Sequence, residues 1–424
     1  MNKIEFYKET EFKETPIGKI PKDWRSVKLR EVAGVRGNKN ISGFEKVAFI
    51  PMELISETKI YADYHVKASN EIKSYIYCEA GDILLAKITP SLENGKQGIV
   101  PFDIPNRFAL ATTEVFPIYC REIDRFFLFY ILKFPKFRNK IIASMTGTTG
   151  RQRASKESVE NLDIPFPPIV EQRAVAGVLS VVDLAIQRTD MVIAKTERLK
   201  KGLMQTLLTR GIGHKEFKDT EIGKIPKTWQ TVKLGEALEL CQYGLSIPMK
   251  DYGRYPIIRM DEIIDGYVIP QITKYVDLDD ETFRSFKLEK GDILFNRTNA
   301  YELVGRTGIF LLDGDYVFAS YLIRLRPKHE IFDPHFLTYY LIFSQDRLRQ
   351  LATKAVHQAN INATNLKKFT IPKPPLEEQQ KIASIIFSVD QKLEFERKEK
   401  IRLEMIKQGL MDLLLTGKIR VKVN

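Results

Sequence analysis

Few residues in this sequence have the types and spacing that catalysis requires. Asp63 followed by Glu71-Ile72-Lys73 matches the acidic residue and Glu-x-Lys triplet with which some nucleases bind magnesium, because hard cations prefer carboxylate oxygens. Such triplets arise often in a chain with 66 Lys and Arg and 54 Asp and Glu residues. The match therefore gives little support to a nuclease, and we expect no catalytic residue here.

Two other segments match cofactor-binding motifs only in part. Asp163-Ile164-Pro165-Phe166 resembles the Asn-Pro-Pro-aromatic motif that holds the flipped base in adenine methyltransferases, but isoleucine replaces the first proline. Gly95-Lys96 does not end a phosphate-binding loop, because Pro90 stands where the first glycine should be and Gln97 follows the lysine. A self-contained DNA methyltransferase or nuclease remains an alternative hypothesis, which would need an active site built from other residues.

The cysteines and histidines do not indicate a metal site. Cys78, Cys120 and Cys241 are widely spaced, odd in number and without histidines at metal-ligand intervals. The five histidines are scattered along the chain. We expect ordinary buried or half-buried thiols, no disulfide and no bound metal.

The composition indicates folded domains with a polyanionic partner. A chain of 424 residues exceeds what one hydrophobic core usually supports, so two or more domains are expected. Its net charge of +12 attracts phosphate at long range, and DNA, RNA and acidic lipid all fit that charge. Because no stretch approaches the roughly 20 apolar residues that span a bilayer, we expect a soluble, cytoplasmic protein.

The sequence contains an internal duplication. Residues 12–29 read FKETPIGKIPKDWRSVKL, and residues 217–234 read FKDTEIGKIPKTWQTVKL. Later segments repeat in the same order, with GDILL at Gly81 returning as GDILF at Gly291, and IPFPP at Ile164 returning as IPKPP at Ile371. A duplicated chain constrains architecture more than any local pattern does, so we expect two similar domains.

A long helix should follow the globular part of each half. Pro167-Pro168 and Pro374-Pro375 stop the preceding strands, acidic residues suit the first turns, and Gly211 and Gly417 suit the far ends. Apolar spacings of three, four and seven are typical of coiled coils. The residues expected to pair the helices are Val175, Leu179, Val182, Ile186, Leu203, Leu207, Ile382, Ile386, Val389, Leu393, Leu410 and Leu414.

We expect these two helices to pair with each other, antiparallel. Roughly 40 residues of helix span about 60 Å, and a domain of about 165 residues is not wide enough to bury such a length. The first helix would carry the chain from one domain to the other and the second would return it, so that the domains lie at opposite ends. A polar middle around Thr189, Glu396 and Lys400 should weaken the pairing there.

The globular parts should be α/β domains with mixed α+β structure, in two pseudo-symmetric repeats separated by the helix pair. Short β-branched runs predict strands near residues 47–50, 83–88, 257–260 and 293–295. Aromatic-rich segments at residues 126–134 and 336–343 should be buried helices. The predicted boundaries are 1–166 for the first domain, 167–211 for its helix, 212–373 for the second domain and 374–424 for its helix.

In this order and twice over, these pieces resemble the specificity subunits of type I restriction-modification enzymes. The strongest markers are Ile20-Pro21-Lys22-Asp23-Trp24 with Ile225-Pro226-Lys227-Thr228-Trp229, and the Pro-Pro-x-x-Glu-Gln motifs at residues 167–172 and 374–379. The resemblance spans nearly the whole chain. It implies that each globular part is a target recognition domain that reads one half of a bipartite DNA site, while the helix pair sets the spacing and docks partner subunits.

The resemblance also implies the partners of the chain. Family members bind double-stranded DNA and assemble with methyltransferase (modification) subunits and with restriction and translocase subunits. S-adenosylmethionine, ATP and magnesium are expected on those partners, and no cofactor or membrane contact is expected in this chain. A basic coiled-coil adaptor for RNA is a third hypothesis, which predicts no preference for duplex DNA with a split site.

Base contacts should lie where the two halves differ between matching strands, because domains that read different sequences must differ there. Three loops in each half qualify, and their amide, hydroxyl and cationic side chains can contact base edges or phosphates. The candidates in the first half are Arg36, Asn38, Lys39, Lys87, Thr89, Lys96, Thr148, Thr149, Arg151, Gln152 and Arg153. Those in the second half are Gln242, Tyr243, Arg297, Asn299, Arg306, His357, Gln358, Asn360 and Asn362.

Overall fold

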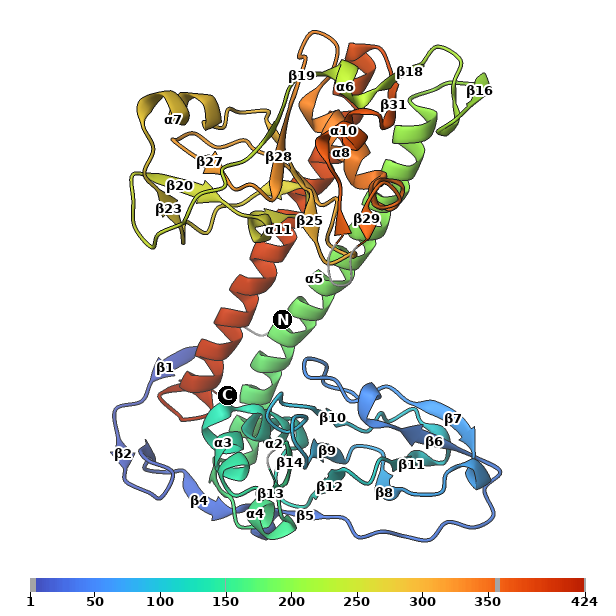
Figure 1. The fold of residues 1–424 in the computed structure, drawn as a ribbon. Coiled ribbons are helices and arrows are strands. Elements are labelled where there is room, and N and C mark those ends of the chain that lie inside the picture. Colours follow the sequence, from blue (N-terminus) through green and yellow to red (C-terminus); the bar gives the residue numbers. More distant parts are fainter. Residues whose placement is uncertain (1–4, 149, 355–358, 423–424) are drawn as a thin grey trace. The chain divides into compact units, whose positions relative to one another are not determined.

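The computed structural model of the chain describes residues 5–148, 150–354 and 359–422 (Figure 1). Two units emerge from the contacts within the chain. The first unit comprises Met1–Val192 and Glu396–Asn424, and the second comprises Ile193–Phe395. Helices α5 (Ile169–Arg210) and α11 (Leu376–Leu414) each contribute one part to each unit.

Two four-stranded sheets form the globular part of the first unit. The antiparallel sheet has the order β10 (Gln97–Ile99), β9 (Ile83–Ala86), β12 (Val115–Cys120) and β5 (Ala33–Val35). The mixed sheet has the order β7 (His65–Ala68), β6 (Lys46–Ile50), β11 (Phe108–Ala111) and β8 (Ile76–Glu79), with β6 and β11 parallel. In β9, Ile83 and Leu85 join one apolar cluster and Leu84 joins another, so both faces are buried and the strand is apolar throughout.

The second unit repeats this plan with a longer sheet. Its six strands have the order β19 (Leu238–Tyr243), β28 (Leu322–Pro327), β24 (Ile293–Asn296), β26 (Thr307–Ile309), β22 (Tyr267–Val268) and β21 (Ile263–Ile264). A smaller sheet has the order β23 (Tyr275–Val276), β20 (Tyr255–Ile258) and β27 (Val317–Phe318), with β20 and β27 parallel. The predicted α/β class with mixed sheets is confirmed in both units.

An aromatic helix is buried at the same place in each unit. Helix α2 (Arg125–Lys133) is capped by Asp124, which accepts hydrogen bonds from two backbone N–H groups of the first turn. Helix α8 (Pro334–Phe343) is capped by Asp333, which accepts one such hydrogen bond, from Phe336 N. Most of their aromatic side chains are buried, which confirms the predicted helices. Helix α3 (Pro135–Ala143) follows α2 directly.

The ends of two predicted strands are wrong. Strand β9 ends at Ala86, and Lys87 and Ile88 already belong to the following loop. Strand β20 ends at Ile258, and Met260 begins a 3-10 turn because the Glu262 carboxylate accepts a hydrogen bond from Arg259 N. β-branched composition locates a strand, whereas side-chain to backbone hydrogen bonds of this kind end it.

Short strand pairs connect the two ends of each domain. Strand β4 (Arg25–Lys28) pairs with β15 (Asp163–Phe166), and β18 (Gln230–Lys233) pairs with β31 (Thr370–Lys373), both antiparallel. Lys28 Nζ lies 3.3 Å from a carboxylate oxygen of Asp163. The segment that partly matches a methyltransferase motif is therefore a paired strand, whose acidic residue serves an ion pair.

In the first unit, ion pairs show how α5 and α11 run past each other. Lys407 Nζ lies 2.6 Å from Asp183, and Lys400 Nζ lies 2.7 Å from Asp190. Seven residues forward along α5 correspond to seven residues backward along α11, so the helices are antiparallel, as predicted. Lys400, a residue of the polar middle that the sequence predicts to weaken the pairing, contributes an ion pair to it.

The second unit carries the equivalent arrangement. Lys200 Nζ lies 2.5 Å from Asp390, in the same antiparallel register. Asp390 also accepts a hydrogen bond from the Tyr339 hydroxyl at 2.9 Å, as Asp183 does from the Tyr130 hydroxyl at 2.7 Å. Tyr130 and Tyr339 occupy the same turn of α2 and α8, so each unit links its aromatic helix to the helix pair through one carboxylate.

Toward the end of α5, the buried positions lie one residue later than the sequence predicts. Val175, Leu179 and Ile186 are buried, and further along Met204 and Leu208 are buried. Leu203 and Leu207 are half-buried. An α-helix drifts about 20° per heptad relative to a perfect seven-residue repeat, so the face directed at the core moves along the helix. Among the other predicted pairing residues, Ile382, Ile386, Leu393 and Leu414 are buried, and Val182, Val389 and Leu410 are half-buried.

A tryptophan–glutamate hydrogen bond joins each domain to the start of a long helix. Trp24 Nε1 donates to Glu171 at 3.0 Å, and Trp229 Nε1 donates to Glu378 at 2.9 Å. Both indoles are completely buried. The tryptophan ends the Ile-Pro-Lys-x-Trp marker and the glutamate belongs to the Pro-Pro-x-x-Glu-Gln marker, so the two repeated motifs are the two sides of one contact, here called the Trp–Glu joint.

The glutamine of the same motif orients the aromatic helix. Gln172 Oε1 accepts a hydrogen bond from Asp124 N at 2.8 Å, and Gln379 Oε1 accepts one from Asp333 N at 3.0 Å. In both, the amide nitrogen donates to the backbone oxygen of the proline five residues earlier. Each Glu-Gln pair thus connects one long helix to two parts of its domain.

Glycines are required where the long helices end. Gly211 and Gly417 have φ of +63° and +72°, which favour glycine. A Cβ on Gly417 would lie 2.4 Å from the Pro21 ring, and one on Gly211 would lie 2.7 Å from the Trp229 ring. Both glycines therefore lie against the Trp–Glu joint, and the predicted helix ends are confirmed to within three residues.

Candidate nucleic-acid interface

Two of the three predicted loops of the first unit lie together. The loop after β9 contacts the hairpin of β13 (Thr146–Thr148) and β14 (Arg151–Arg153), since Thr89 N donates to Gln152 O at 3.0 Å and Ala154 N donates to Lys87 O at 2.8 Å. Most of the side chains here are at least partly exposed. The surface that they form, here called the first loop cluster, comprises Lys87, Thr89, Thr148, Arg151, Gln152 and Arg153.

The charges in the first loop cluster are only partly paired. Arg153 Nη2 donates to Glu114 at 2.7 Å, although its side chain remains 63% exposed. Lys87 Nζ lies 5.4 Å from the centre of the Phe116 ring. The Arg151 side chain is exposed on the hairpin. Cations held this loosely can exchange their contacts for phosphate oxygens, which is what a positioning contact to DNA requires.

Arg36 lies in the framework of the fold. Its Nε and Nη2 atoms donate to the buried carboxylate of Asp82 at 2.6 and 2.8 Å, and this hydrogen bonding raises the pKa of the arginine. In the second unit Arg326 makes the same paired contact to Asp292 at 2.7 and 2.9 Å. The repeated Gly-Asp-Ile-Leu motif therefore supplies an anchor for an arginine, a role that sequence reasoning missed because the arginine comes from a different segment in each half.

The other candidates of the first unit contact different parts of it. Asn38 Oδ1 accepts a hydrogen bond from Tyr77 N at 3.1 Å, and Lys39 Nζ lies 5.2 Å from the Tyr77 ring centre, so both border β8 of the mixed sheet. Lys96 Nζ donates to Met52 O at 3.1 Å. The structure thus places the first predicted loop and Lys96 against elements other than the hairpin.

In the second unit all three predicted loops meet. The Arg297 guanidinium lies 4.9 Å from the ring centre of Tyr243, at the end of β19. The Tyr243 hydroxyl accepts a hydrogen bond from Ala363 N at 2.7 Å, and Thr298 Oγ1 donates to Asn360 Oδ1 at 3.2 Å. Tyr243, Arg297, Thr298 and Asn360 form the second loop cluster, in which β25 (Thr298–Asn299) pairs with β30 (Ala359–Asn360).

The remaining candidates of the second unit have varied positions. Asn362 caps the short helix α10 (Ala363–Lys367) by accepting a hydrogen bond from Asn365 N. Gln242 contacts Arg324 and Ser285 beside β19. Arg306 is exposed, and Asn299 is paired with Ala359 in the ladder of β25 and β30. Thr149, His357 and Gln358 lie outside the described residues.

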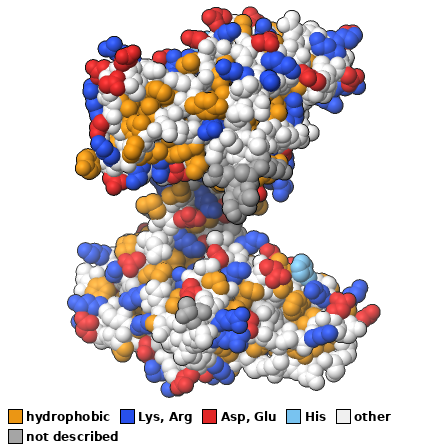
Figure 2. Space-filling view, in the orientation of Figure 1, with side chains coloured by type: hydrophobic (Ala, Val, Ile, Leu, Met, Phe, Trp, Pro, Cys, Tyr) orange, Lys and Arg blue, Asp and Glu red, His pale blue; other side chains and the backbone are white. Residues whose placement is uncertain are grey.

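Basic and acidic side chains alternate over the visible surface of each unit. Figure 2 shows Lys and Arg interspersed with Asp and Glu on this face of both units. Among the described residues on this face, no large area is covered by side chains of one sign alone.

The cysteine thiols are poor nucleophiles. Cys78 is buried, and Cys120 and Cys241 are half-buried, as predicted. Burial raises the pKa of Cys120 to about 12 and also raises that of Cys78 and Cys241. Because the thiolate is the reactive form, these groups are unsuited to covalent catalysis.

The described part of the chain shows neither a membrane-spanning helix nor a cluster of metal ligands. Over residues 5–148, 150–354 and 359–422, no helix combines the length and apolar character that crossing a membrane demands. Within the same ranges, no three His, Cys, Asp or Glu side chains gather in a way that could hold a metal ion.

The repeated architecture and the paired loop clusters coincide with a known family. The model of the type I restriction modification DNA specificity domain matches twice, at residues 21–196 and 226–405. The chain belongs to the type I restriction-modification specificity subunits. Its two specificity domains each contain one loop cluster, and each match includes one Pro-Pro-x-x-Glu-Gln motif.

Relatives of similar length support this assignment. The putative type I restriction enzyme MjaX specificity subunit and the type I restriction enzyme MjaVIII specificity subunit, both of Methanocaldococcus jannaschii, are each 30% identical to this chain. The alignments cover 99% of this chain in both, with 99% of the MjaX subunit and 98% of the MjaVIII subunit. The specificity-domain plan therefore extends over the full length of these relatives.

Solved structures share the fold. The type I restriction-modification S subunit of M. genitalium matches with a TM-score of 0.57 and 17% identity, over 94% of this chain and 98% of that one. A chain from a study of assembly and conformational transition of the type I R-M system has the same TM-score, with 21% identity, over 94% of this chain and 99% of that one. At these identities the likeness supports the fold alone.

Proposed function

We propose that this specificity subunit reads a bipartite target on duplex DNA, with one half-site for each specificity domain. The observation that carries this proposal is that the same framework presents different side chains in its two loop clusters. The first cluster offers Lys87 on the loop after β9 and Arg151 and Gln152 on a hairpin. The second offers Tyr243, Arg297 and Asn360. Amide and guanidinium groups can read base edges, while the remaining cations hold phosphate.

The helix pair suits the role of spacer and docking surface. The antiparallel ion pairs and the Trp–Glu joints hold each domain against the helices within its unit. Several apolar side chains on the helices remain exposed, among them Val181, Met191, Phe395 and Met405. Exposed apolar side chains can contact partner proteins, and we assign these to the docking of methyltransferase and restriction subunits.

In this proposal the chain has no catalytic activity of its own. S-adenosylmethionine, ATP and magnesium would be bound by the partner subunits, and the chain would determine where they act. The inert character of the thiols and the structural use of Asp163 are consistent with this division of labour.

The test measures methylation with and without partners. The purified chain, given duplex DNA, S-adenosylmethionine, ATP and magnesium, should neither methylate nor cleave, and both activities should appear when its methyltransferase and restriction subunits are added. Mapping the methylated positions should reveal a motif of two specified parts separated by unspecified bases. Methylation or cleavage by the chain alone would support the self-contained enzyme instead.

Exchanging domains tests the modular reading. Replacing residues 1–166 with the equivalent part of a relative should change one half of the methylated motif and leave the other half as it was. Altered readout in both halves would contradict the assignment of one half-site to each domain.

A further inference from the structure

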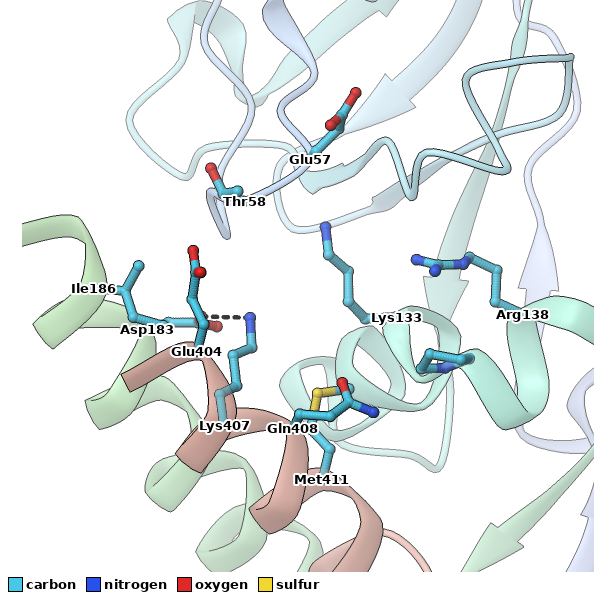
Figure 3. Close-up of a pocket in the computed structure, with 11 residues that line it drawn as sticks. Glu57, Thr58, Lys133, Arg138, Asp183, Ile186, Glu404, Lys407, Gln408 and Met411 are labelled. Atoms are coloured by element: carbon cyan, nitrogen blue, oxygen red, sulfur yellow. Dashed lines mark ion pairs between the residues drawn. The ribbon is translucent and has the colours of Figure 1, made fainter. Parts of the chain in front are cut away.

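A cavity of about 200 Å³ lies within the first unit, beside the helix pair (Figure 3). Its lining includes Lys133 at the end of α2, Arg138 on α3, Asp183 on α5, and Lys407 and Gln408 on α11. A water molecule occupies about 30 Å³ in the liquid. The cavity therefore has room for a tetrahedral oxyanion together with several water molecules.

Two cations that line this cavity lack an acidic partner. Among the residues that the structure describes, neither Lys133 nor Arg138 forms an ion pair with a carboxylate, and Lys133 Nζ donates to Gly95 O at 3.0 Å. The Nε atom of Arg138 is buried and has no hydrogen-bond acceptor within the described chain. In Figure 3 the Arg138 guanidinium points toward the side of the cavity where Lys133 lies, and the Lys133 side chain extends toward the loop that carries Glu57 and Thr58. Withdrawing cations from water without a counter-charge is unfavourable, so Lys133 here is stabilised either by losing its proton or by binding an anion beside Arg138.

The carboxylates nearby do not balance these two charges. Asp183 lies 2.6 Å from Lys407, so its charge is already compensated (Figure 3). Glu57 and Glu404, which also line the cavity, are exposed to solvent. Exposed carboxylates are screened by water and salt, whereas the half-buried cations are screened less. Lys133 and Arg138 therefore lack a buried counter-charge of their own among the residues that line the cavity.

The second unit lacks this pair of cations. Counting from the helix caps Asp124 and Asp333, the position of Lys133 is taken by Ile342, and that of Arg138 by Arg347. Arg347 donates to the Tyr340 hydroxyl at 3.1 Å and its guanidinium lies 4.8 Å from the centre of the Phe369 ring. The shared framework can thus be built without the lysine, and the two cations that line the cavity are a feature of the first unit.

We propose that Lys133 and Arg138 form a binding site for a small, free dianion of the phosphate class. The lysine supplies a point charge and the arginine a planar set of donors, which together suit a tetrahedral oxyanion. Gln408 supplies a further amide donor from α11. The site is built from α2, α3 and the helix pair, and it is independent of base reading by the loop clusters.

Binding of inorganic phosphate to the full-length chain tests the proposal. Calorimetry at constant ionic strength, set with chloride, should show saturable binding, and the variant K133M/R138M should bind about tenfold more weakly or worse. Methionine preserves the apolar stems of both side chains. Lys140→Met, which removes an exposed cation from α3, is the matched control and should bind phosphate normally. Absent binding in the natural chain, or equal binding in the double variant, would refute the site.

Thermal unfolding provides a second measurement that does not depend on a folded double variant. Phosphate should raise the unfolding temperature of the natural chain beyond the effect of chloride at equal ionic strength, because a ligand of the native state stabilises it. Phosphate should raise the unfolding temperature of the Lys140→Met variant equally. No difference between phosphate and chloride would contradict the proposal.

The pH dependence of anion affinity should identify Lys133 as a ligand of the anion. Burial, together with the charges of Lys407 and Arg138, lowers the pKa of Lys133 to about 7. Sulfate remains a dianion throughout, so its affinity should fall about tenfold from pH 6 to pH 8 as Lys133 loses its proton. The charged groups facing Lys133 from the surrounding elements are Glu57, Arg138, Asp183, Glu404 and Lys407. Lys133→Met should abolish the dependence; if the variant retains it, another of these groups is responsible and the assignment to Lys133 is wrong.

A DNA-binding measurement separates a free anion from a backbone phosphate of DNA. The double variant should bind a duplex target as the natural chain does, within about twofold, when both are tested in chloride without phosphate. A large loss of duplex affinity, together with no binding of inorganic phosphate, would overturn the proposal in favour of a DNA contact.

Discussion

The two Trp–Glu joints use the same tryptophan and glutamate but different third partners. In the first unit Arg420 donates to Glu171 at 2.8 and 2.7 Å and also to Asp23 at 2.8 and 2.7 Å. In the second unit His214 Nε2 lies 2.8 Å from Glu378, beside Trp229. One joint is therefore held by a permanent cation with several bonds, and the other by an imidazole with one.

The two third partners come from different elements. Arg420 lies on β32 (Ile419–Val421), which pairs antiparallel with β1 (Phe6–Lys8) and so brings the C-terminal segment to the first unit. His214 lies in the segment that continues from α5 into the second domain. The same tryptophan and glutamate are thus completed by Arg420 in one unit and by His214 in the other.

The largest expected effect comes from removing the permanent cation. Arg420→Met should reduce the free energy of unfolding of the first unit by about 3–5 kcal/mol, because it leaves the buried Glu171 carboxylate without its cation. Hydrogen exchange in the native state, read separately for each unit, measures the change. Lys422→Met, whose exposed side chain pairs with Glu5, is the control and should cost no more than about 1 kcal/mol. Equal effects of Arg420→Met and Lys422→Met would show that Arg420 contributes no more to the first joint than an exposed ion pair does.

The next effect concerns readout by the two loop clusters. Gln152→Ala and Asn360→Ala should each relax base preference by about 1–3 kcal/mol in one half of the methylated motif, because an amide can bond two edge atoms of one base. The base preference is measured by sequencing the sites that the complete complex methylates in a randomised plasmid library. Lys140→Met, outside both clusters, should leave the motif unchanged. If either amide variant alters both halves, the clusters do not act separately.

A smaller effect is expected from the second joint. His214→Ala should reduce the free energy of unfolding of the second unit by about 1 kcal/mol, since Glu378 retains hydrogen bonds from Trp229 Nε1 at 2.9 Å and Ile212 N at 2.9 Å. Hydrogen exchange again reports each unit by itself. A loss as large as that of Arg420→Met would show that both joints depend equally on their third partner.

The smallest effect should come from the middle of the helix pair. Lys400→Met removes an ion pair to Asp190 between side chains that are 31% and 40% exposed, and it should cost no more than about 1 kcal/mol. Denaturant unfolding with Arg402→Met as an exposed control on the same helix measures the difference. A cost of several kcal/mol would mean that this stretch is a rigid centre of the pairing.

Much of the fold could be predicted because it depends on short-range patterns. The duplication, the helices between Pro168 and Gly211 and between Pro375 and Gly417, and the buried aromatic helices all follow from periodicity, caps and breakers over a few turns. The sequence places Lys87 and Thr89 after a matching strand and Arg151–Arg153 before the Pro-rich exit, but it does not predict that these two segments meet.

The partners of individual side chains could not be predicted from those patterns. Arg36 is a candidate for DNA contact by its loop position, yet in the structure it is held by Asp82, which is 46 residues away in sequence. Likewise Met204 and Leu208 take the buried positions beside Leu203 and Leu207, because helix rotation against a particular core decides the face.

The number of domains, the two long helices and the family markers can be derived from the amino-acid sequence, since repeated motifs and apolar periodicity are local properties of the chain. The folded structure was needed to show that the two markers of each half meet in a Trp–Glu joint, that Arg420 contacts Glu171, which lies 249 residues earlier, and that Lys133 and Arg138 share a cavity. Such contacts depend on how distant segments pack, and a buried charge finds its partner only after the chain has folded around it.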